Sequence, residues 1–216
     1  MTVTERQTVL VIDDHPLVRN GLRRLFELGE DFQFVGEAAD GATGLDLAKQ
    51  LNPDLIVLDI SMKGMNGIET LKAIKAADLD SQVIMLTYSD DEDILMSALR
   101  GGADGFLLKN MDIDEVCEKL SSASQGNLVL SEELVDKLVR AQRKKGHLTD
   151  PGLTDREWEI VNLIVEGLAN KAIARRLDIT EGTVKQHIKN VFKKTNLHSR
   201  LEVAIWGRDK CQKHGG

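Results

Sequence analysis

Five side chains, spread over nearly a hundred positions, are of the types needed for metal-assisted phosphoryl transfer. The acid pair Asp13-Asp14 and the single Asp59 offer carboxylates, whereas Thr87 and Lys109 offer hydrogen-bond donors. Crowded carboxylates repel one another unless a cation neutralises them, and an all-oxygen cluster suits Mg²⁺ better than zinc or copper. Lysine and threonine suit an anion such as a phosphoryl group. If these residues converge, we expect a Mg²⁺ site in which an aspartate accepts a phosphoryl group.

These residues lie at the ends of short aliphatic runs, which predict where they meet. The runs are Val9-Leu10-Val11-Ile12, Leu55-Ile56-Val57-Leu58, Val83-Ile84-Met85-Leu86 and Phe106-Leu107-Leu108. Continuous aliphatic runs, separated by stretches of helical period, are typical of strands in a buried parallel sheet. Ligands bind beyond the carboxyl ends of such strands. The five side chains are therefore expected at one edge of the sheet.

The first 125 residues alternate five times between expected strand and expected helix. This alternation predicts an α/β fold with a doubly wound, five-stranded parallel sheet. The expected strands span 8–12, 33–37, 54–58, 82–87 and 104–108, and the expected helices span 16–28, 41–51, 66–76, 91–100 and 112–124.

The last part of the chain indicates helices only, and hence a second, all-α domain. Thr154 and Glu157 have the spacing of a capping box at the start of a helix that runs to Gly167. A short helix over 170–177 is followed by a three-residue turn and by a third helix that begins near Glu181. Two short helices joined in this way are typical of a helix-turn-helix. A fourth helix begins near Ser199.

Charge separates the two parts. Residues 1–130 carry 11 Lys and Arg against 23 Asp and Glu, whereas residues 151–216 carry 12 against 8. An acidic first part and a basic last part indicate two domains with different partners. We predict a domain over 1–127, a helix and basic linker over 128–150, and the helix-turn-helix domain over 151–216.

The third helix of the second domain has the two faces expected of a DNA-reading helix. At 100° per residue, one side collects an apolar stripe and the other collects lysines and an amide, which can reach base edges in the major groove. Thr180, Thr183 and the free N–H groups at the helix start suit phosphate contacts. The stripe comprises Val184, Ile188, Val191, Phe192 and Thr195, and the polar face comprises Lys185, Gln186, Lys189 and Lys193.

Two sets of motifs resemble known domains. Val11-Ile12-Asp13-Asp14-His15-Pro16, the run Asp59 to Gly67, Thr87 and the run Gly102 to Lys109 resemble the receiver domain of two-component response regulators. The segment from Leu153 to His187 is similar to the LuxR-type DNA-binding domain. Together they resemble the NarL/FixJ class of response regulators over essentially the whole chain, and within it the nitrate/nitrite regulators.

The resemblance implies roles for individual residues. Asp59 would accept a phosphoryl group from a sensor histidine kinase, and Lys109 would neutralise charge on the transferring group. Asp14 and Asp59 would bind Mg²⁺ directly, Asp13 through water, and Ser61 through its main-chain carbonyl. Thr87 would then bond a phosphoryl oxygen, and the ring of Phe106 would fill the space that Thr87 leaves.

The resemblance also implies partners. The receiver would cover the recognition helix until phosphorylation releases it, and the freed domain would form a homodimer on double-stranded promoter DNA and regulate transcription. RNA polymerase is a further candidate partner. Such a protein accepts a phosphoryl group but is not a turnover enzyme, and it works in the cytoplasm. Neither a signal peptide nor an apolar run of about 18 residues is evident, so no membrane partner is expected.

Three other functions would place different demands on the sequence. An aspartyl-phosphate phosphohydrolase would need an Asp-x-Asp motif after the first strand, whereas Asp13-Asp14-His15 has no second acid at that spacing. A small-molecule-sensing LuxR regulator would need an aromatic-rich pocket, and only 4% of the residues are aromatic. A pseudo-receiver that is not phosphorylated is hardest to exclude, although it would normally have lost one of the five residues.

Separate predictions concern two residues next to the predicted site. His15, between Asp14 and Pro16, is expected to be a surface residue at a helix start. Tyr88 is bulky where small residues are frequent in receivers, so we expect it to restrict access and to lengthen the lifetime of an aspartyl phosphate.

Overall fold

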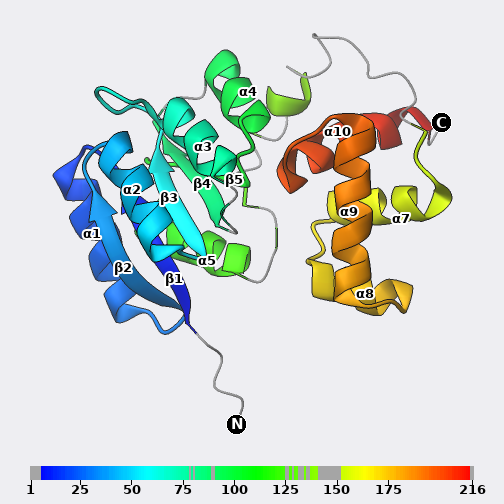
Figure 1. The fold of residues 1–216 in the computed structure, drawn as a ribbon, viewed down its shortest axis with the longest axis horizontal. Helices are drawn as coiled ribbons and strands as arrows, with labels where there is room; N and C mark the ends of the chain where they lie inside the picture. The colour runs from blue at the N-terminus through cyan, green and yellow to red at the C-terminus, as the bar shows by residue number, and fades with distance from the viewer. Residues whose placement is uncertain are drawn as a thin grey trace.

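The computed structural model describes residues 6–77, 79, 81–88, 91–124, 127, 129–130, 134, 137–140 and 152–214. It contains an α/β half and an all-helical half (Figure 1). Both parts of the predicted fold class are therefore confirmed.

The α/β half is built on five parallel strands. They are β1 (Gln7–Ile12), β2 (Phe32–Ala38), β3 (Leu55–Asp59), β4 (Gln82–Thr87) and β5 (Gly105–Leu108). Their order in the sheet is β2-β1-β3-β4-β5, the doubly wound arrangement. Because the order reverses beside β1, the ends of β1 and β3 form the switch point where ligands bind in such folds.

Five helices connect and cover the strands. They are α1 (Pro16–Leu28), α2 (Gly41–Leu51), α3 (Gly67–Ala76), α4 (Glu92–Arg100) and α5 (Ile113–Ser124). The expected starts of α3 and α4 lie one residue early. The reason is that Asn66 and Asp91 are N-cap residues, whose side chains accept hydrogen bonds from the first turn while their backbones stay extended.

The aliphatic runs supply both faces of the sheet. Successive side chains in a strand point to opposite faces, so each run is divided between two cores. Leu10, Ile12, Ile56 and Leu58 pack with α2, α3 and α4. Val9, Val11, Leu55 and Val57 pack with α1 and α5.

The all-helical half consists of α7 (Asp155–Val165), α8 (Asn170–Leu177), α9 (Glu181–Thr195) and α10 (Arg200–His214). The predicted capping box is present at the start of α7: Thr154 accepts from the Glu157 N–H, and the Glu157 side chain accepts from the Thr154 N–H. Helices α8 and α9 are joined by residues 178–180, which gives the predicted helix-turn-helix.

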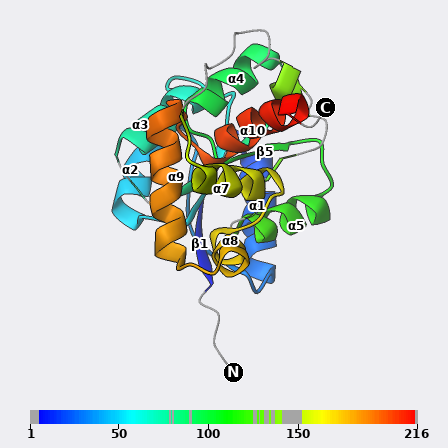
Figure 2. The ribbon, with the colours of Figure 1, turned by 90° about the vertical axis from the view of Figure 1, so that its right-hand side faces the viewer.

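Helix α10 packs against α7 and also against α4 of the other half, and the two ribbon views place α10 beside α4 (Figures 1 and 2). Leu201 and Ile205 belong to the same packed cluster as Leu95 and Leu99 of α4. Most of the predicted helix and linker over 128–150, including residues 141–150, lies outside the described residues, whereas residues 134 and 137–140 are helical.

Candidate functional site

The ends of β1, β3 and β5 bring two carboxylates and an ammonium into contact. The Lys109 Nζ lies 2.7 Å from Asp13 Oδ2 and 2.9 Å from Asp59 Oδ2. All three side chains are 1% exposed. The main-chain N–H of Lys109 donates to the Thr87 carbonyl at 2.8 Å, which ties the end of β5 to the end of β4. Asp13, Asp59 and Lys109 therefore meet at one edge of the sheet, as predicted.

Asp14 and Ser61 complete the edge. Asp14 is partly exposed, and its carboxylate oxygen groups with those of Asp13 and Asp59, with all ligand atoms of the cluster within 4.8 Å of one another. The Ser61 N–H donates to Asp59 Oδ1 at 3.1 Å, which fixes the Asp59 carboxylate. The loop from β3 to α3 can fold back closely onto the end of β3 because residue 67 is a glycine. A Cβ at Gly67 would lie 2.0 Å from the Asp59 carbonyl oxygen.

The electrostatics of this edge fit a bound cation. Burial raises the pKa of Asp59; the Lys109 ammonium opposes this rise, and the neighbouring Asp13 carboxylate adds to it. The carboxylates of Asp13, Asp14 and Asp59 gather at one point, and the Lys109 ammonium contacts two of them. Three carboxylates around one point are the oxygen donor set that a hard divalent cation prefers.

Thr87 and Phe106 lie in the two strands that follow β3 in the sheet. Both are fully buried, Thr87 at the end of β4 and Phe106 in β5. Phe106 belongs to the cluster that also contains Leu95 and Leu99 of α4 and, from the other half, Leu201. The residue predicted to act as a switch thus lies in a core that reaches the second domain.

His15 has a more central place than its sequence position indicated. It is the N-cap residue of α1 and is half exposed, as expected of a helix start. Its Nδ1, however, lies 2.8 Å from Asp14 Oδ1 and 3.1 Å from Asp13 Oδ1. Tyr88 stands at the same entrance, with its ring edge-on to the imidazole and Lys109 Nζ 5.4 Å from its centroid.

The helix α9 presents the two predicted faces. Val184, Ile188, Val191 and Thr195 are buried and Phe192 packs against the same cluster, whereas Lys185, Gln186, Lys189 and Lys193 are exposed. Thr180 is the N-cap residue: its Oγ1 accepts from the Thr183 N–H at 3.1 Å and lies 2.8 Å from the Thr183 hydroxyl. One of the N–H groups expected to bind phosphate is therefore already bonded.

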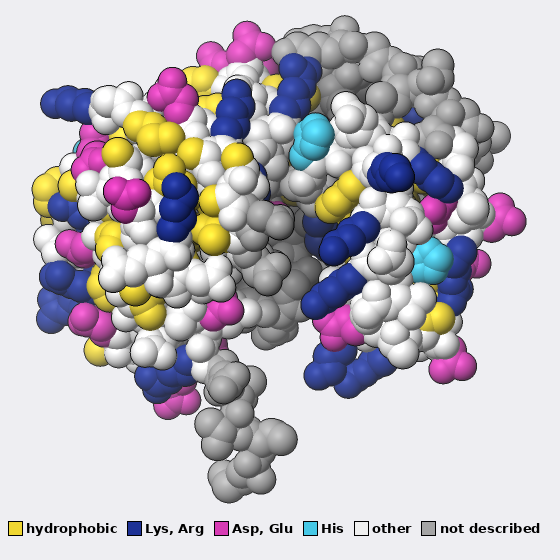
Figure 3. All heavy atoms as spheres, viewed as in Figure 1, with side chains coloured by type: hydrophobic (Ala, Val, Ile, Leu, Met, Phe, Trp, Pro, Cys, Tyr) yellow, Lys and Arg dark blue, Asp and Glu magenta, His cyan; other side chains and the backbone are white. Residues whose placement is uncertain are grey.

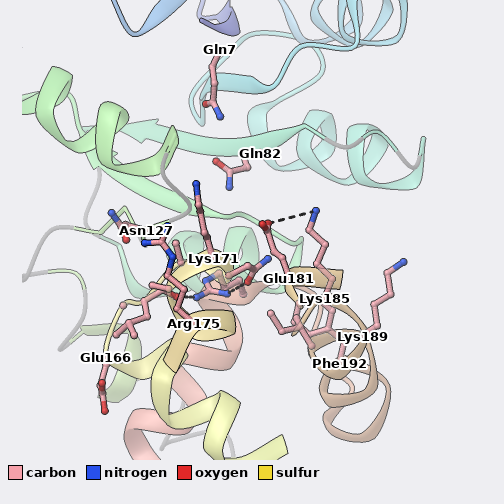
Figure 4. Close-up of a pocket in the computed structure, with 17 residues that line it drawn as sticks. Gln7, Gln82, Asn127, Glu166, Lys171, Arg175, Glu181, Lys185, Lys189 and Phe192 are labelled. Atoms are coloured by element: carbon pink, nitrogen blue, oxygen red, sulfur yellow. Dashed lines mark hydrogen bonds and ion pairs between the residues drawn. The ribbon is translucent and has the colours of Figure 1, made fainter. Parts of the chain in front are cut away.

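A cleft of about 1390 Å³ separates this face from the α/β half (Figure 4). Gln7 and Gln82 lie on one side, and Lys171, Lys185 and Lys189 come from α8 and α9 on the other. Lys171 and Arg175 were not among the predicted residues. Their signal, a basic pair four residues apart on the helix before the turn, was present in the sequence. Figure 3 shows Lys and Arg side chains gathered where the helical half borders the other half.

Comparisons with known proteins agree with both halves. The family model described as "Response regulator receiver domain" matches residues 9–121, and the one described as "Bacterial regulatory proteins, luxR family" matches residues 151–206. The nitrate/nitrite response regulator protein NarL of Escherichia coli K12 is 44% identical over 95% of this chain and 97% of its own. NarP of the same strain is 41% identical over 91% and 92%.

Among solved structures, the response regulator ChrA of a heme-sensing two-component system is 31% identical, with a TM-score of 0.53 and coverage of 96% of this chain and 99% of its own. The chain belongs to the two-component response regulators that join a receiver domain to a LuxR-type DNA-binding domain. Within that family it is similar to the NarL-type transcription regulators. In the part of the chain that the structure describes, none of the helices combines the length and the apolar character that crossing a bilayer requires.

Proposed function

We propose that the protein is a phosphorylation-switched transcription regulator in which Asp59 is the phosphoacceptor. The observation that carries the proposal is the buried contact of Asp59 and Asp13 with Lys109 at the switch point of the sheet. We assign the receiver to residues 1–127, the helix and linker to 128–150, and the DNA-binding domain to 151–216.

Phosphoryl transfer at this edge is a matter of positioning and electrostatics. An Asp59 oxygen attacks phosphorus as the bond to the imidazole nitrogen of the kinase's phosphohistidine breaks, and the imidazole leaves. The Ser61 N–H holds the carboxylate, and Lys109 lies within reach of the incoming oxygens.

Asp14, Asp59, the Ser61 carbonyl and, through water, Asp13 would hold Mg²⁺. When bound, the ion supplies positive charge against the crowded oxygens. The protein accepts the group stoichiometrically and is not a turnover enzyme.

The switch then acts through packing. In the phosphorylated protein the Thr87 hydroxyl donates to a phosphoryl oxygen, and the Phe106 ring moves into the space that Thr87 leaves. Because Phe106 shares one packed cluster with α4 and with Leu201 and Ile205 of α10, its movement changes the surface on which α10 rests. A local change of packing thereby biases a two-state contact between the domains.

The same contact controls access to DNA. A recognition helix enters a major groove about 12 Å wide and 8.5 Å deep, between two phosphate backbones. In this structure Lys185 and Lys189 face a cleft whose far side is the receiver. This arrangement supports a covered, resting state. Release would let two copies bind promoter DNA as a homodimer, with RNA polymerase a candidate partner, in the cytoplasm where promoter DNA and the kinase's output meet.

The stimulus belongs to the kinase. NarL and NarP are named for nitrate and nitrite. The receiver, however, recognises a phosphohistidine and not the signal itself, so the likeness assigns no stimulus to this chain.

Incubation with a small phosphodonor tests the phosphoacceptor. With acetyl phosphate and Mg²⁺, we expect one phosphoryl group per chain by intact mass, and borohydride reduction followed by peptide mapping should place it on Asp59. Asp59→Asn and chelation with EDTA should each abolish the mass shift. A phosphoryl group that forms on Asp59→Asn, or without a divalent cation, would contradict the proposal.

A further inference from the structure

The imidazole of His15 lies against the three carboxylates of the predicted metal site. Its Nδ1 is 2.8 Å from Asp14 Oδ1, 3.1 Å from Asp13 Oδ1 and 3.7 Å from Asp59 Oδ2. The residue is held there by its backbone, because its N–H donates to Asp13 Oδ1 at 2.8 Å. The nitrogen and one oxygen from each of the three carboxylates all lie within 4.8 Å of one another.

These distances match adjacent ligands of one metal ion. In an octahedral site with bonds of about 2.1 Å, neighbouring ligand atoms stand about 3 Å apart. A second observation is independent of the histidine. Asp13 and Asp59 are 1% exposed, and the single Lys109 ammonium contacts one oxygen of each. With Asp14 beside them, three clustered carboxylates face this one lysine, and a divalent cation would neutralise the remaining negative charge.

We propose that His15 is a nitrogen ligand of this metal site and that it shifts the site's selectivity toward divalent first-row transition metals such as Mn²⁺. Oxygen ligands suit both Mg²⁺ and Mn²⁺, whereas an imidazole nitrogen adds affinity for first-row transition metals, least for Mn²⁺ and more for the later ions. One nitrogen among the oxygens therefore still adds more affinity for Mn²⁺ than for Mg²⁺, which is not a transition metal. This inference rests on the proposed function, since it concerns the same metal site.

Tyr88 helps to hold the imidazole in place. Its ring lies edge-on to that of His15, with centroids 6.5 Å apart and planes at 78°. His15 is otherwise half exposed, at 52%, so it can turn onto an ion that enters from solvent. The alternative role for the imidazole is a hydrogen bond to Asp14 with no contact to the metal.

Pulsed electron paramagnetic resonance of Mn²⁺ bound to the full chain separates the two roles. We expect the wild type to show the ¹⁴N coupling of a directly coordinated imidazole and His15→Gln to lose it. Competition titrations of the same proteins should show Mn²⁺ affinity about tenfold lower in His15→Gln, with Mg²⁺ affinity nearly unchanged. His15→Ala serves as a second variant, and His187→Gln in the DNA-binding domain as the matched control that retains the coupling.

The outcomes distinguish this inference from the function on which it rests. A ¹⁴N coupling that persists in His15→Gln and His15→Ala, or an unchanged ratio of Mn²⁺ to Mg²⁺ affinity, would overturn the role of His15. If binding of both metals is still lost in Asp59→Ala, the metal site of the proposed function stands. Absence of binding of either metal to the wild type would overturn both.

Discussion

Tyr88 covers the entrance to the phosphoacceptor site. The residue is 66% exposed, and its ring centroid lies 5.4 Å from Lys109 Nζ, with the ring edge-on to that of His15. A ring at this position limits the approach of the water that hydrolyses an aspartyl phosphate. We predict that Tyr88→Ala shortens the lifetime of the phosphorylated protein by about threefold or more.

The decay of the phosphorylated band on a phosphate-affinity gel measures this lifetime. Tyr88→Phe is the matched control, because it keeps the ring and removes only the hydroxyl, and its decay should equal that of the wild type. Equal decay of wild type and Tyr88→Ala would show that the ring does not restrict access.

The sequence could predict which residues meet at this site but not how each side chain is oriented. Asp13, Asp59 and Lys109 could be predicted because each ends an aliphatic run, and the ends of parallel strands share an edge. His15 follows the acid pair and precedes a proline, which correctly indicates a helix start. The imidazole points back toward the carboxylates because His15 is the N-cap residue of α1 and has an extended backbone. The spacing of residues along the chain does not predict this orientation.

At the scale of elements, the strands and helices could be predicted because the hydrophobic periodicity and the capping residues indicate the same elements. The runs at 9–12 and 55–58 divide between the two faces of the sheet, and Thr154 and Glu157 form the capping box that their spacing indicated. Helix α10 is different. Every residue from 201 to 207 is buried, so no single apolar face can be identified from the sequence. The sequence therefore indicates that the helix is buried but not which elements pack against it.

A buried glutamate in α10 gives a prediction with a defined pH dependence. Burial raises the pKa of Glu202; the His198 N–H, which donates to its Oε2 at 2.8 Å, and Arg100 of α4 oppose this rise. Because the pKa is higher in the folded than in the unfolded protein, ionisation of Glu202 costs stability. The cost is fully present above the folded-state pKa and vanishes below the ordinary value of 4.5.

We therefore predict that Glu202→Gln unfolds at higher denaturant concentration than the wild type at pH 7, by on the order of 1 kcal/mol. The difference should shrink as the pH falls to about 4. Glu157→Gln is the matched control of opposite sign. Burial alone would raise the pKa of Glu157, but Lys194 and Thr154 outweigh it and lower the pKa. That variant should be less stable at pH 7. A destabilised Glu202→Gln would contradict the account.

Two lysines of the basic face should differ in what they recognise. Lys189 lies on the exposed face of α9, and Lys171 lies on α8, the helix that crosses the DNA backbone in helix-turn-helix complexes. In the phosphorylated protein, Lys189→Ala should cost about 1–3 kcal/mol on the preferred site and relax its sequence preference.

Lys171→Ala should instead weaken binding about equally on all sequences and reduce the salt slope by about 1. Fluorescence anisotropy with the selected duplex and with a scrambled duplex, at several salt concentrations, measures both effects. If the two variants give the same loss on both duplexes, the assigned roles are wrong.

At the scale of the molecule, the sequence indicated two domains of opposite charge but not their arrangement. The receiver carries the excess of acid, yet among the described residues those of the receiver that line the cleft are the amides Gln7, Gln82 and Asn127. Charge asymmetry along the chain therefore does not describe this part of the contact. Between α10 and the α4 side of the receiver, the structure shows an apolar packed cluster, with Arg100 of α4 acting on the charge of Glu202 of α10. This contact depends on which face of α10 is not already packed against α7.

Leu201 tests that contact. It is 1% exposed and belongs to the receiver-side cluster, whereas Val203, two residues on, is equally buried in the cluster of the helical domain. Leu201→Ala should weaken the closed arrangement by about 2 kcal/mol or more. We expect the radius of gyration of the unphosphorylated variant, from small-angle scattering, to rise toward that of the activated wild type. Val203→Ala should remain as compact as the wild type, and an equal radius for both variants would contradict the assignment.

The central claim is that phosphorylation of Asp59 uncovers the DNA-reading face. The most direct test is selection from a random duplex pool by the full chain, with and without Mg²⁺ and beryllofluoride, and with Asp59→Ala as control. We predict enrichment of paired half-sites about one helical turn apart, only with the phosphoryl mimic and only in the wild type. Equal enrichment by the wild type without the mimic, or by Asp59→Ala, would contradict the claim, because DNA binding would then not depend on the receiver.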